Sequence, residues 1–100
     1  MLEDEVFHAL ADPHRRLMLE RLLARNGRTL GELADDVGIS RFAVMKHLRV
    51  LEAANLLLTE KVGRVKLHYL NAAPLRRVEQ EWIRRFTRAD AVPARRDDTA

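Results

Sequence analysis

The sequence has 100 residues, of which 47% are apolar and 33% charged, a balance typical of one small globular domain and unlike that of disordered chains. Cysteine is absent, which excludes disulfides, thiolate metal sites and cysteine nucleophiles. The N-terminal segment is acidic where a secretory signal needs basic residues, and no apolar stretch reaches membrane-spanning length. We therefore expect a cytoplasmic protein with no membrane partner.

Positive charge is concentrated in the middle of the sequence. The net charge of the whole chain is +3, but residues 40–70 contain six basic and two acidic side chains and so carry +4. A polyanion is the natural partner of such a segment, although a solvated basic face is the simpler alternative. The aromatic content of 5% argues against a stacking platform for single-stranded nucleic acid.

The first part of the sequence predicts three helices. Residues 3–10 have the apolar spacing of a short helix. Asp12 indicates the start of a second helix, because a capping carboxylate there precedes Pro13 at the first helical position. Thr29 and Glu32 have the spacing of a capping box, which begins a third helix.

A tight turn and a fourth helix follow. Gly38 ends the third helix in the left-handed conformation that such a turn requires. Ser40 then caps a helix that runs to about Ala54, and Asn55 can take the left-handed turn usually given to glycine. Two helices joined by so short a turn predict a helix-turn-helix over residues 29–54.

The pattern then changes to that of strands. Residues 56–59 and 65–70 are apolar or alternate, and they predict a hairpin with Gly63 at its tip. A last helix follows, and residues 89–100 lack periodicity and are expected to form a disordered tail. The predicted fold is mainly α with a small β-hairpin: a winged helix-turn-helix domain over residues 1–88, in the order ααααββα.

The fourth helix and the hairpin are candidates for contact with double-stranded DNA. When the apolar stripe of the helix is buried, its other side chains face outward and suit the major groove, which accepts one helix. The predicted contacts on this recognition helix are Ser40, Arg41, Phe42, Met45, Lys46, His47 and Arg49. Those on the hairpin, or wing, are Lys61, Arg64 and Lys66, which suit phosphates or the minor groove.

Two of these assignments have an equally supported alternative. Phe42 can contact thymine methyl groups, or it can complete the core of the domain. His47 can donate a hydrogen bond to phosphate, or it can pack under the wing as a neutral side chain. The sequence alone leaves both choices open.

The terminal helices carry more apolar side chains than a small body can cover, which favours a homodimer. The predicted interface residues are Val6, Phe7, Leu10, Val78, Trp82, Ile83 and Phe86. A two-fold pairing of these helices would place two recognition helices about 34 Å apart, one turn of DNA. The alternative is that these side chains fold back onto their own domain.

Three segments carry a family resemblance. They are Ala-Leu-Ala-Asp-Pro-His-Arg-Arg at 9–16, Gly-Glu-Leu-Ala at 31–34, and Val-Met-Lys-His-Leu-Arg-Val-Leu-Glu-Ala-Ala at 44–54. In this order and spacing they resemble the ArsR/SmtB family of winged-helix repressors, over residues 7–86. The resemblance implies a dimer joined by its first and last helices, a recognition helix at 40–54 and a wing in the hairpin.

The sequence departs from the metal-sensing members of that family. Their cysteines on the helix that corresponds to residues 32–37 are missing, and the last helix contains no histidine. Asp12 and His14, with His8 nearby, fall short of the three or four convergent ligands that zinc needs. No metal site and no cofactor is therefore expected.

The sequence thus predicts a transcriptional regulator, specifically a repressor that binds a palindromic operator as a homodimer. Enzymatic activity is not expected, because Ser40 lies in a capping position and no glycine-rich phosphate loop is present. Two alternatives stay open: a winged-helix module for protein–protein assembly, and a sensor of a small-molecule effector that nothing in the sequence names.

Overall fold

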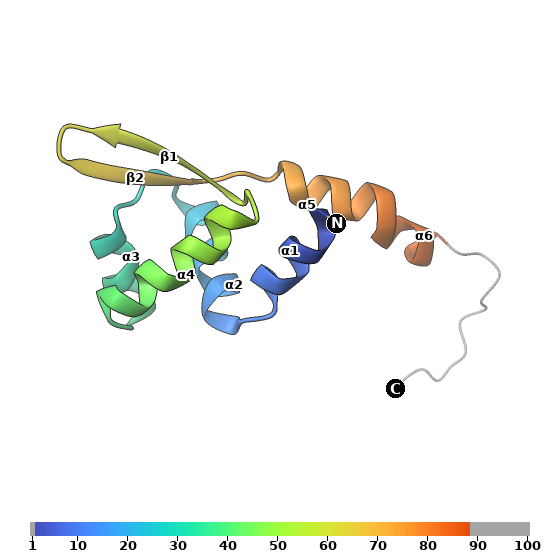
Figure 1. Cartoon of the computed structure of the whole chain (residues 1–100), viewed down its shortest axis with the longest axis horizontal. Helices are drawn as coiled ribbons and strands as arrows, with labels where there is room; N and C mark the ends of the chain where they lie inside the picture. Colours follow the sequence, from blue (N-terminus) through green and yellow to red (C-terminus); the bar gives the residue numbers. More distant parts are fainter. Residues whose placement is uncertain (1, 89–100) are drawn as a thin grey trace.

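The computed structural model describes residues 2–88 and has the predicted order of elements (Figure 1). They are α1 (Leu2–Leu10), α2 (Pro13–Ala24), α3 (Leu30–Val37), α4 (Arg41–Ala53), β1 (Leu57–Val62), β2 (Val65–Leu70), α5 (Ala73–Val78), the π-helical segment η1 (Glu79–Ile83) and α6 (Arg84–Thr87). The prediction of a mainly helical winged helix-turn-helix fold is confirmed. The tail predicted at 89–100 lies outside the described residues.

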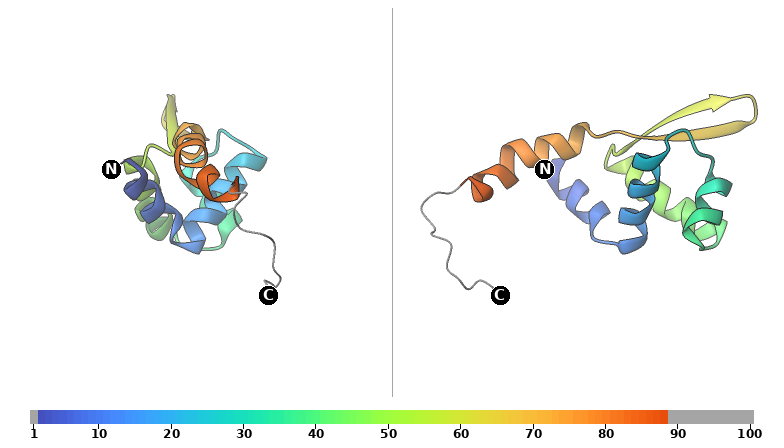
Figure 2. Two further views of the ribbon diagram at one scale, coloured as in Figure 1. Left: turned by 90° about the vertical axis from the view of Figure 1, so that its right-hand side faces the viewer. Right: turned by 180° about the vertical axis from the view of Figure 1, so that it is seen from behind.

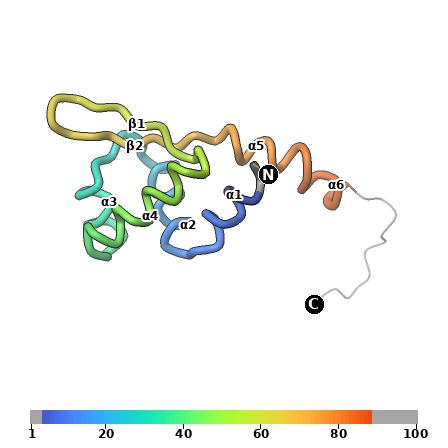
Figure 3. The backbone as a smooth tube through the Cα atoms, in the orientation of Figure 1, coloured from blue at the N-terminus to red at the C-terminus, as the bar shows by residue number. Residues whose placement is uncertain are grey.

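The helices α1 to α4 form a body from which two projections extend in opposite directions. The hairpin of β1 and β2 passes over α3 and α4 and reaches beyond them at one end (Figure 1). The chain from α5 to α6 packs beside α1 and continues past it at the other end, as the view from behind also shows (Figure 2). The path of the backbone from α4 into the hairpin and then into α5 can be followed in Figure 3.

Side-chain caps fix where the helices of the body begin. Asp12 Oδ1 accepts hydrogen bonds from the backbone N–H groups of His14 (2.8 Å) and Arg15 (3.2 Å). Thr29 and Glu32 form the complete capping box, with distances of 2.9 and 3.1 Å. Each cap satisfies backbone donors that a helix start leaves unpaired, so these predicted helix starts are confirmed.

The turn between α3 and α4 depends on a left-handed glycine. Gly38 has a φ of 82°, and its backbone N–H donates to the carbonyl of Ala34. A Cβ at this position would meet no atom within 4 Å. A substitution here would therefore meet backbone strain alone, without a steric clash.

Replacing Gly38 with alanine is expected to lower the free energy of unfolding by about 1 kcal/mol, because a Cβ disfavours the left-handed conformation. Gly38→Asn is the matched control, since asparagine tolerates that conformation better and should lose less. Urea denaturation with an unchanged m-value measures both losses. Equal losses in the two variants would contradict the strain argument.

The core lies between the four body helices and the base of the hairpin. Its buried apolar side chains are Ala9, Met18, Leu19, Leu22, Leu33, Ala34, Val44, Leu48, Leu51, Ala54, Leu56 and Leu57. In α4 the buried positions recur at spacings of four and three residues, so they occupy one side of the helix. The opposite side of α4 is left free for contact with another molecule.

The hairpin is longer than the sequence pattern indicates. Its strands pair in antiparallel register from Leu57 and Leu70 at the base to Val62 and Val65 at the tip. The first strand was expected to end at residue 59, because polar residues follow. These residues fit the strand because most of the hairpin is exposed and needs no continuous apolar face. Gly63, with a φ of 61°, occupies the first position of the two-residue turn.

The base of the hairpin is tied to the loop before α3. Arg28 and His68 pair as an isolated antiparallel bridge, in which the backbone N–H of His68 donates to the carbonyl of Arg28 at 2.8 Å. The Nδ1 atom of the buried His68 ring lies 2.8 Å from the same carbonyl oxygen. Asn26 adds a third link by accepting from the N–H of Leu70 at 2.7 Å. The base of the wing is thereby fixed to the helix-turn-helix.

The C-terminal helix is interrupted in a way that the sequence did not predict. The segments α5, η1 and α6 follow one another without a gap, but η1 is π-helical. A π turn contains an extra residue, so it rotates the side chains beyond it relative to those of a regular α-helix. Trp82 and Ile83 lie in this segment and Phe86 follows it.

Candidate nucleic-acid interface

The exposed side of α4 combines positive charge with an apolar ring. Residues on an α-helix are about 100° apart, so Phe42, Lys46 and Arg49 lie opposite the buried stripe. All three are exposed, and Phe42 is 66% exposed. This exposure excludes the alternative in which Phe42 completes the core. The Lys46 ammonium lies 5.3 Å from the centre of the Phe42 ring, a cation–π contact that holds both at the surface.

The start of α4 is also open to an anion. The Ser40 side chain is exposed and accepts from the N–H of Ala43 at 3.1 Å, which confirms its predicted capping role. A helix N-terminus carries partial positive charge, and Arg41 adds a full charge there. The Arg41 guanidinium lies so close over Gly31 that a Cβ at Gly31 would be 2.9 Å from its Nη2 atom.

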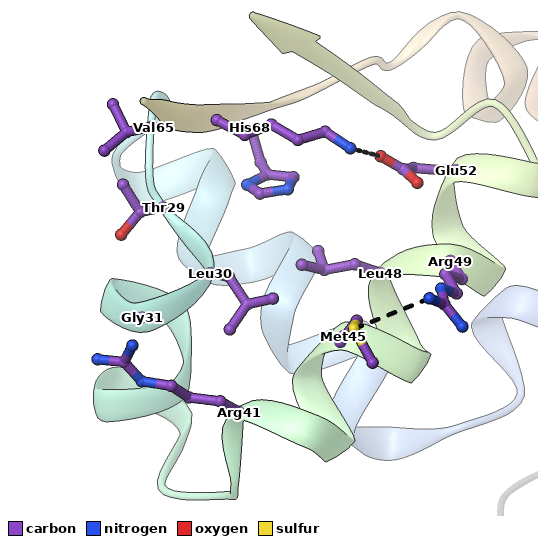
Figure 4. Close-up of a pocket in the computed structure, with 11 residues that line it drawn as sticks. Thr29, Leu30, Gly31, Arg41, Met45, Leu48, Arg49, Glu52, Val65 and His68 are labelled. Atoms are coloured by element: carbon purple, nitrogen blue, oxygen red, sulfur yellow. Dashed lines mark hydrogen bonds and ion pairs between the residues drawn. The ribbon is translucent and has the colours of Figure 1, made fainter. Parts of the chain in front are cut away.

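A groove of about 540 Å³ lies between α3, α4 and the hairpin (Figure 4). The basic side chains Arg41, Arg49 and Lys66 line it, and Leu30 and Leu48 form part of its apolar lining. Met45 is half-buried beside the groove, with its sulfur 3.9 Å from Arg49 Nη2. Lys66 is paired with Glu52 at 3.2 Å, so the groove is only partly cationic.

The wing places like charges side by side. Lys61 and Lys66 face each other directly across the two strands, and Arg64 is exposed in the turn at the tip. Like charges in opposing positions destabilise a hairpin. The ion pair of Lys66 with Glu52 offsets part of this repulsion, and a phosphate that contacts Lys61 or Arg64 would offset more of it.

His47 lies on a different side of α4 from the other predicted contacts. Its Nδ1 atom is 3.4 Å from Arg15 Nη1, and its ring centre is 5.7 Å from that of His14. Partial burial lowers the pKa of His47, against the opposing charge of Asp12. The residue thus faces the start of α2, a neighbourhood that the sequence did not predict. No local pattern links positions so far apart in the chain.

The predicted interface residues divide into two groups. Val6 and Val78 are buried within the single chain, with 2% and 3% of their surface exposed, and Leu10 packs against the core. The exposed members are Phe7, Trp82, Ile83 and Phe86. Three of these are aromatic and contact one another edge to face, with ring centres 5.3 Å apart for Phe7 and Trp82 and 4.8 Å apart for Trp82 and Phe86. We call these four exposed residues the terminal apolar face.

A capped helix that is exposed on its cationic side, beside a basic hairpin, defines a winged helix-turn-helix DNA-binding protein. A family model described as a helix-turn-helix domain matches residues 10–60. The chain is 39% identical over 87 residues to YuzN of Bacillus subtilis, an HTH-type transcriptional regulator, a match that covers 81% of this chain and 95% of that protein. The chain belongs to the ArsR family of winged helix-turn-helix transcriptional regulators.

Two further comparisons agree with this family. The transcriptional repressor SdpR of Bacillus subtilis is 32% identical over 72 residues, covering 72% of this chain and 79% of the repressor. The crystal structure of an ArsR family transcriptional regulator superposes with a TM-score of 0.76 at 32% identity, covering 92% of this chain and 94% of that one. The protein is therefore a DNA-binding transcriptional regulator. Within residues 2–88, every helix is too short or too polar to cross a bilayer.

Proposed function

We propose that the protein is a repressor that binds a palindromic operator in double-stranded DNA as a homodimer. The observation that carries the proposal is the exposure of Phe42, Lys46 and Arg49 on the side of α4 opposite its buried stripe. These side chains can reach base edges without any change in the core. In this proposal α4 enters the major groove, where lysine and arginine suit guanine edges and an apolar ring suits thymine methyl groups.

The remaining contacts position the protein on the DNA backbone. Ser40 and Arg41 would hold a phosphate at the start of α4, beside the groove that Met45 borders. Lys61, Arg64 and Lys66 would contact phosphates along the wing. His47 is left out of the proposed contacts because it faces the start of α2.

The terminal apolar face supports the homodimer. An exposed group of aromatic side chains at one end of a small protein is an expected feature of a protein interface, where aromatic residues are enriched. Pairing of two such faces about a two-fold axis would leave both α4 helices free, since the wing and α6 project in opposite directions. Val6 and Val78 are buried within the single chain and are left out of the proposed interface.

The assignment as a repressor draws on the similarity to SdpR, which is named a transcriptional repressor. A dimer on a promoter would then act by occluding it.

Selection of bound fragments from genomic DNA, followed by fluorescence anisotropy on the selected site, tests the proposal. We expect a site with two-fold symmetric halves about one helical turn apart, bound by a dimer with strongly salt-dependent affinity. Salt-independent or undetectable DNA binding would favour the protein–protein module instead. Release of the site by a small molecule would identify the effector of a sensor.

Replacing Arg64 with alanine is expected to weaken binding to the operator and to unrelated DNA by the same factor, because a tip residue contacts phosphate and reads no base. The slope of log affinity against log salt should fall by about one unit. Anisotropy titrations at several salt concentrations give both quantities. A loss confined to the operator would show that Arg64 reads sequence.

A further inference from the structure

Side chains with metal-binding atoms meet where α2 begins. Asp12 caps α2, His14 lies in its first turn, and His47 comes from the middle of α4. One ligand atom from each lies within 4.8 Å of the other two. From this arrangement we propose that Asp12, His14 and His47 bind a divalent transition-metal ion of the Zn²⁺ class, at a position away from the DNA-facing side of α4.

The donor set suits this class of ion. Two imidazole nitrogens and one carboxylate oxygen, completed by water, form a common coordination set for zinc. Ligand atoms on one tetrahedral zinc ion are about 3.4 Å apart, so the side chains must approach by little more than about 1 Å. His14 is exposed, and rotation of its side chain can supply this movement. Asp12 accepts its capping hydrogen bonds through Oδ1, which leaves Oδ2 for the ion.

Arg15 competes for this site. Its Nη1 atom donates to His47 Nδ1 at 3.4 Å, because a guanidinium has no acceptor. The same side chain donates from Nε to the carbonyl of Ala9 at 2.8 Å and from Nη2 to that of His8 at 3.0 Å. Arg15 can therefore release His47 and still hold the end of α1. Displacement of this long hydrogen bond reduces the affinity for the ion but does not require the body to unfold.

An ion at this position would add a further link between α2 and α4, which already pack together and share the hydrogen bond between Arg15 and His47. It would join the first turn of α2 to the middle of α4, next to Lys46. Its ligands come from positions 12, 14 and 47, so both ends of the link lie within the helical body. The site therefore differs from the cysteine and last-helix histidine positions of metal-sensing relatives, and His47 supplies the third ligand that was missing beside Asp12 and His14 in the sequence.

Isothermal titration of the untagged full chain with Zn²⁺, after treatment with a chelator, tests the proposal. The sequence has four histidines and no cysteine, so few variants are needed. We expect one Zn²⁺ per chain in the wild type and in the control His8→Ala, whose histidine is exposed but lies outside the cluster. His14→Ala and His47→Gln should weaken binding by about tenfold or more.

His14→Ala decides the outcome, because His14 is exposed and its removal leaves the core intact. Circular dichroism confirms that each variant is folded. The proposal is overturned if the wild type binds no Zn²⁺, if His14→Ala binds as tightly as the wild type, or if His8→Ala loses as much affinity as His14→Ala.

Discussion

Replacing Trp82 with glutamate is expected to convert the proposed dimer into monomers and to abolish tight operator binding. Trp82 is 42% exposed and contacts both Phe7 and Phe86, so it lies at the centre of the terminal apolar face. Loss of a central tryptophan commonly costs an interface about 2 kcal/mol or more, which is about 30-fold in the dimer dissociation constant. A carboxylate placed in an apolar interface adds a desolvation cost.

Sedimentation equilibrium measures the dimer constant, and anisotropy on the operator measures the consequence for DNA. The matched control is Gln80→Glu, which adds the same charge at an exposed position in the same π-helical segment. We expect this control to stay dimeric. A Trp82→Glu protein that remains a dimer at the concentrations of the wild type would show that the chain pairs through another surface.

Replacing Lys46 with alanine is expected to weaken binding to the selected operator by about 1–3 kcal/mol, or about 5–150-fold. Lys46 is exposed on α4 opposite the buried stripe, and its ammonium is held over the Phe42 ring. If Lys46 contacts a base, the variant should lose affinity for the operator and keep most of its affinity for unrelated DNA. Anisotropy with both DNAs gives the ratio of the two losses.

Arg76→Ala provides the charge-matched control, because it removes one exposed positive charge from α5, outside the groove and the wing. It should leave operator affinity close to that of the wild type. If Lys46→Ala weakens both DNAs equally, then Lys46 contacts phosphate and the bases are read by other residues of α4. If Lys46→Ala keeps its affinity for both DNAs, the proposal that α4 enters the major groove is wrong.

The helix starts could be predicted because their signals are local. Asp12, Thr29 and Ser40 each accept a hydrogen bond from a backbone N–H two or three residues later, as their positions in the sequence indicated. Left-handed Gly38 and Asn55 also act within their own turns, with φ angles of 82° and 61°. These short-range interactions determine the order of elements, which is why the fold was predictable.

The positions that the sequence did not predict depend on contacts between distant segments. His47 was expected at DNA or under the wing, but Arg15 and His14 lie beside it because α2 and α4 cross there. Val6 and Val78 have the same residue type as many interface residues, yet α1 and α5 bury them against the chain itself. Apolar periodicity predicts that a side chain is buried, but it does not tell whether the same chain or a second chain buries it.

In the proposed dimer, the pairing of Arg28 with His68 would restrict how the protein adapts to its operator. Backbone and ring hydrogen bonds at 2.8 Å hold the wing to the segment that leads into α3, so we expect the wing and the helix-turn-helix of one chain to move together. A change in the distance between the two helix-turn-helix units of the proposed dimer would then arise at the junction between β2 and α5. At this junction Asn71 donates to the carbonyl of Asn55 at 2.8 Å. Loosening that junction would widen the range of half-site spacings that the proposed dimer can bind, and the contacts of each helix-turn-helix with its half-site would stay unchanged.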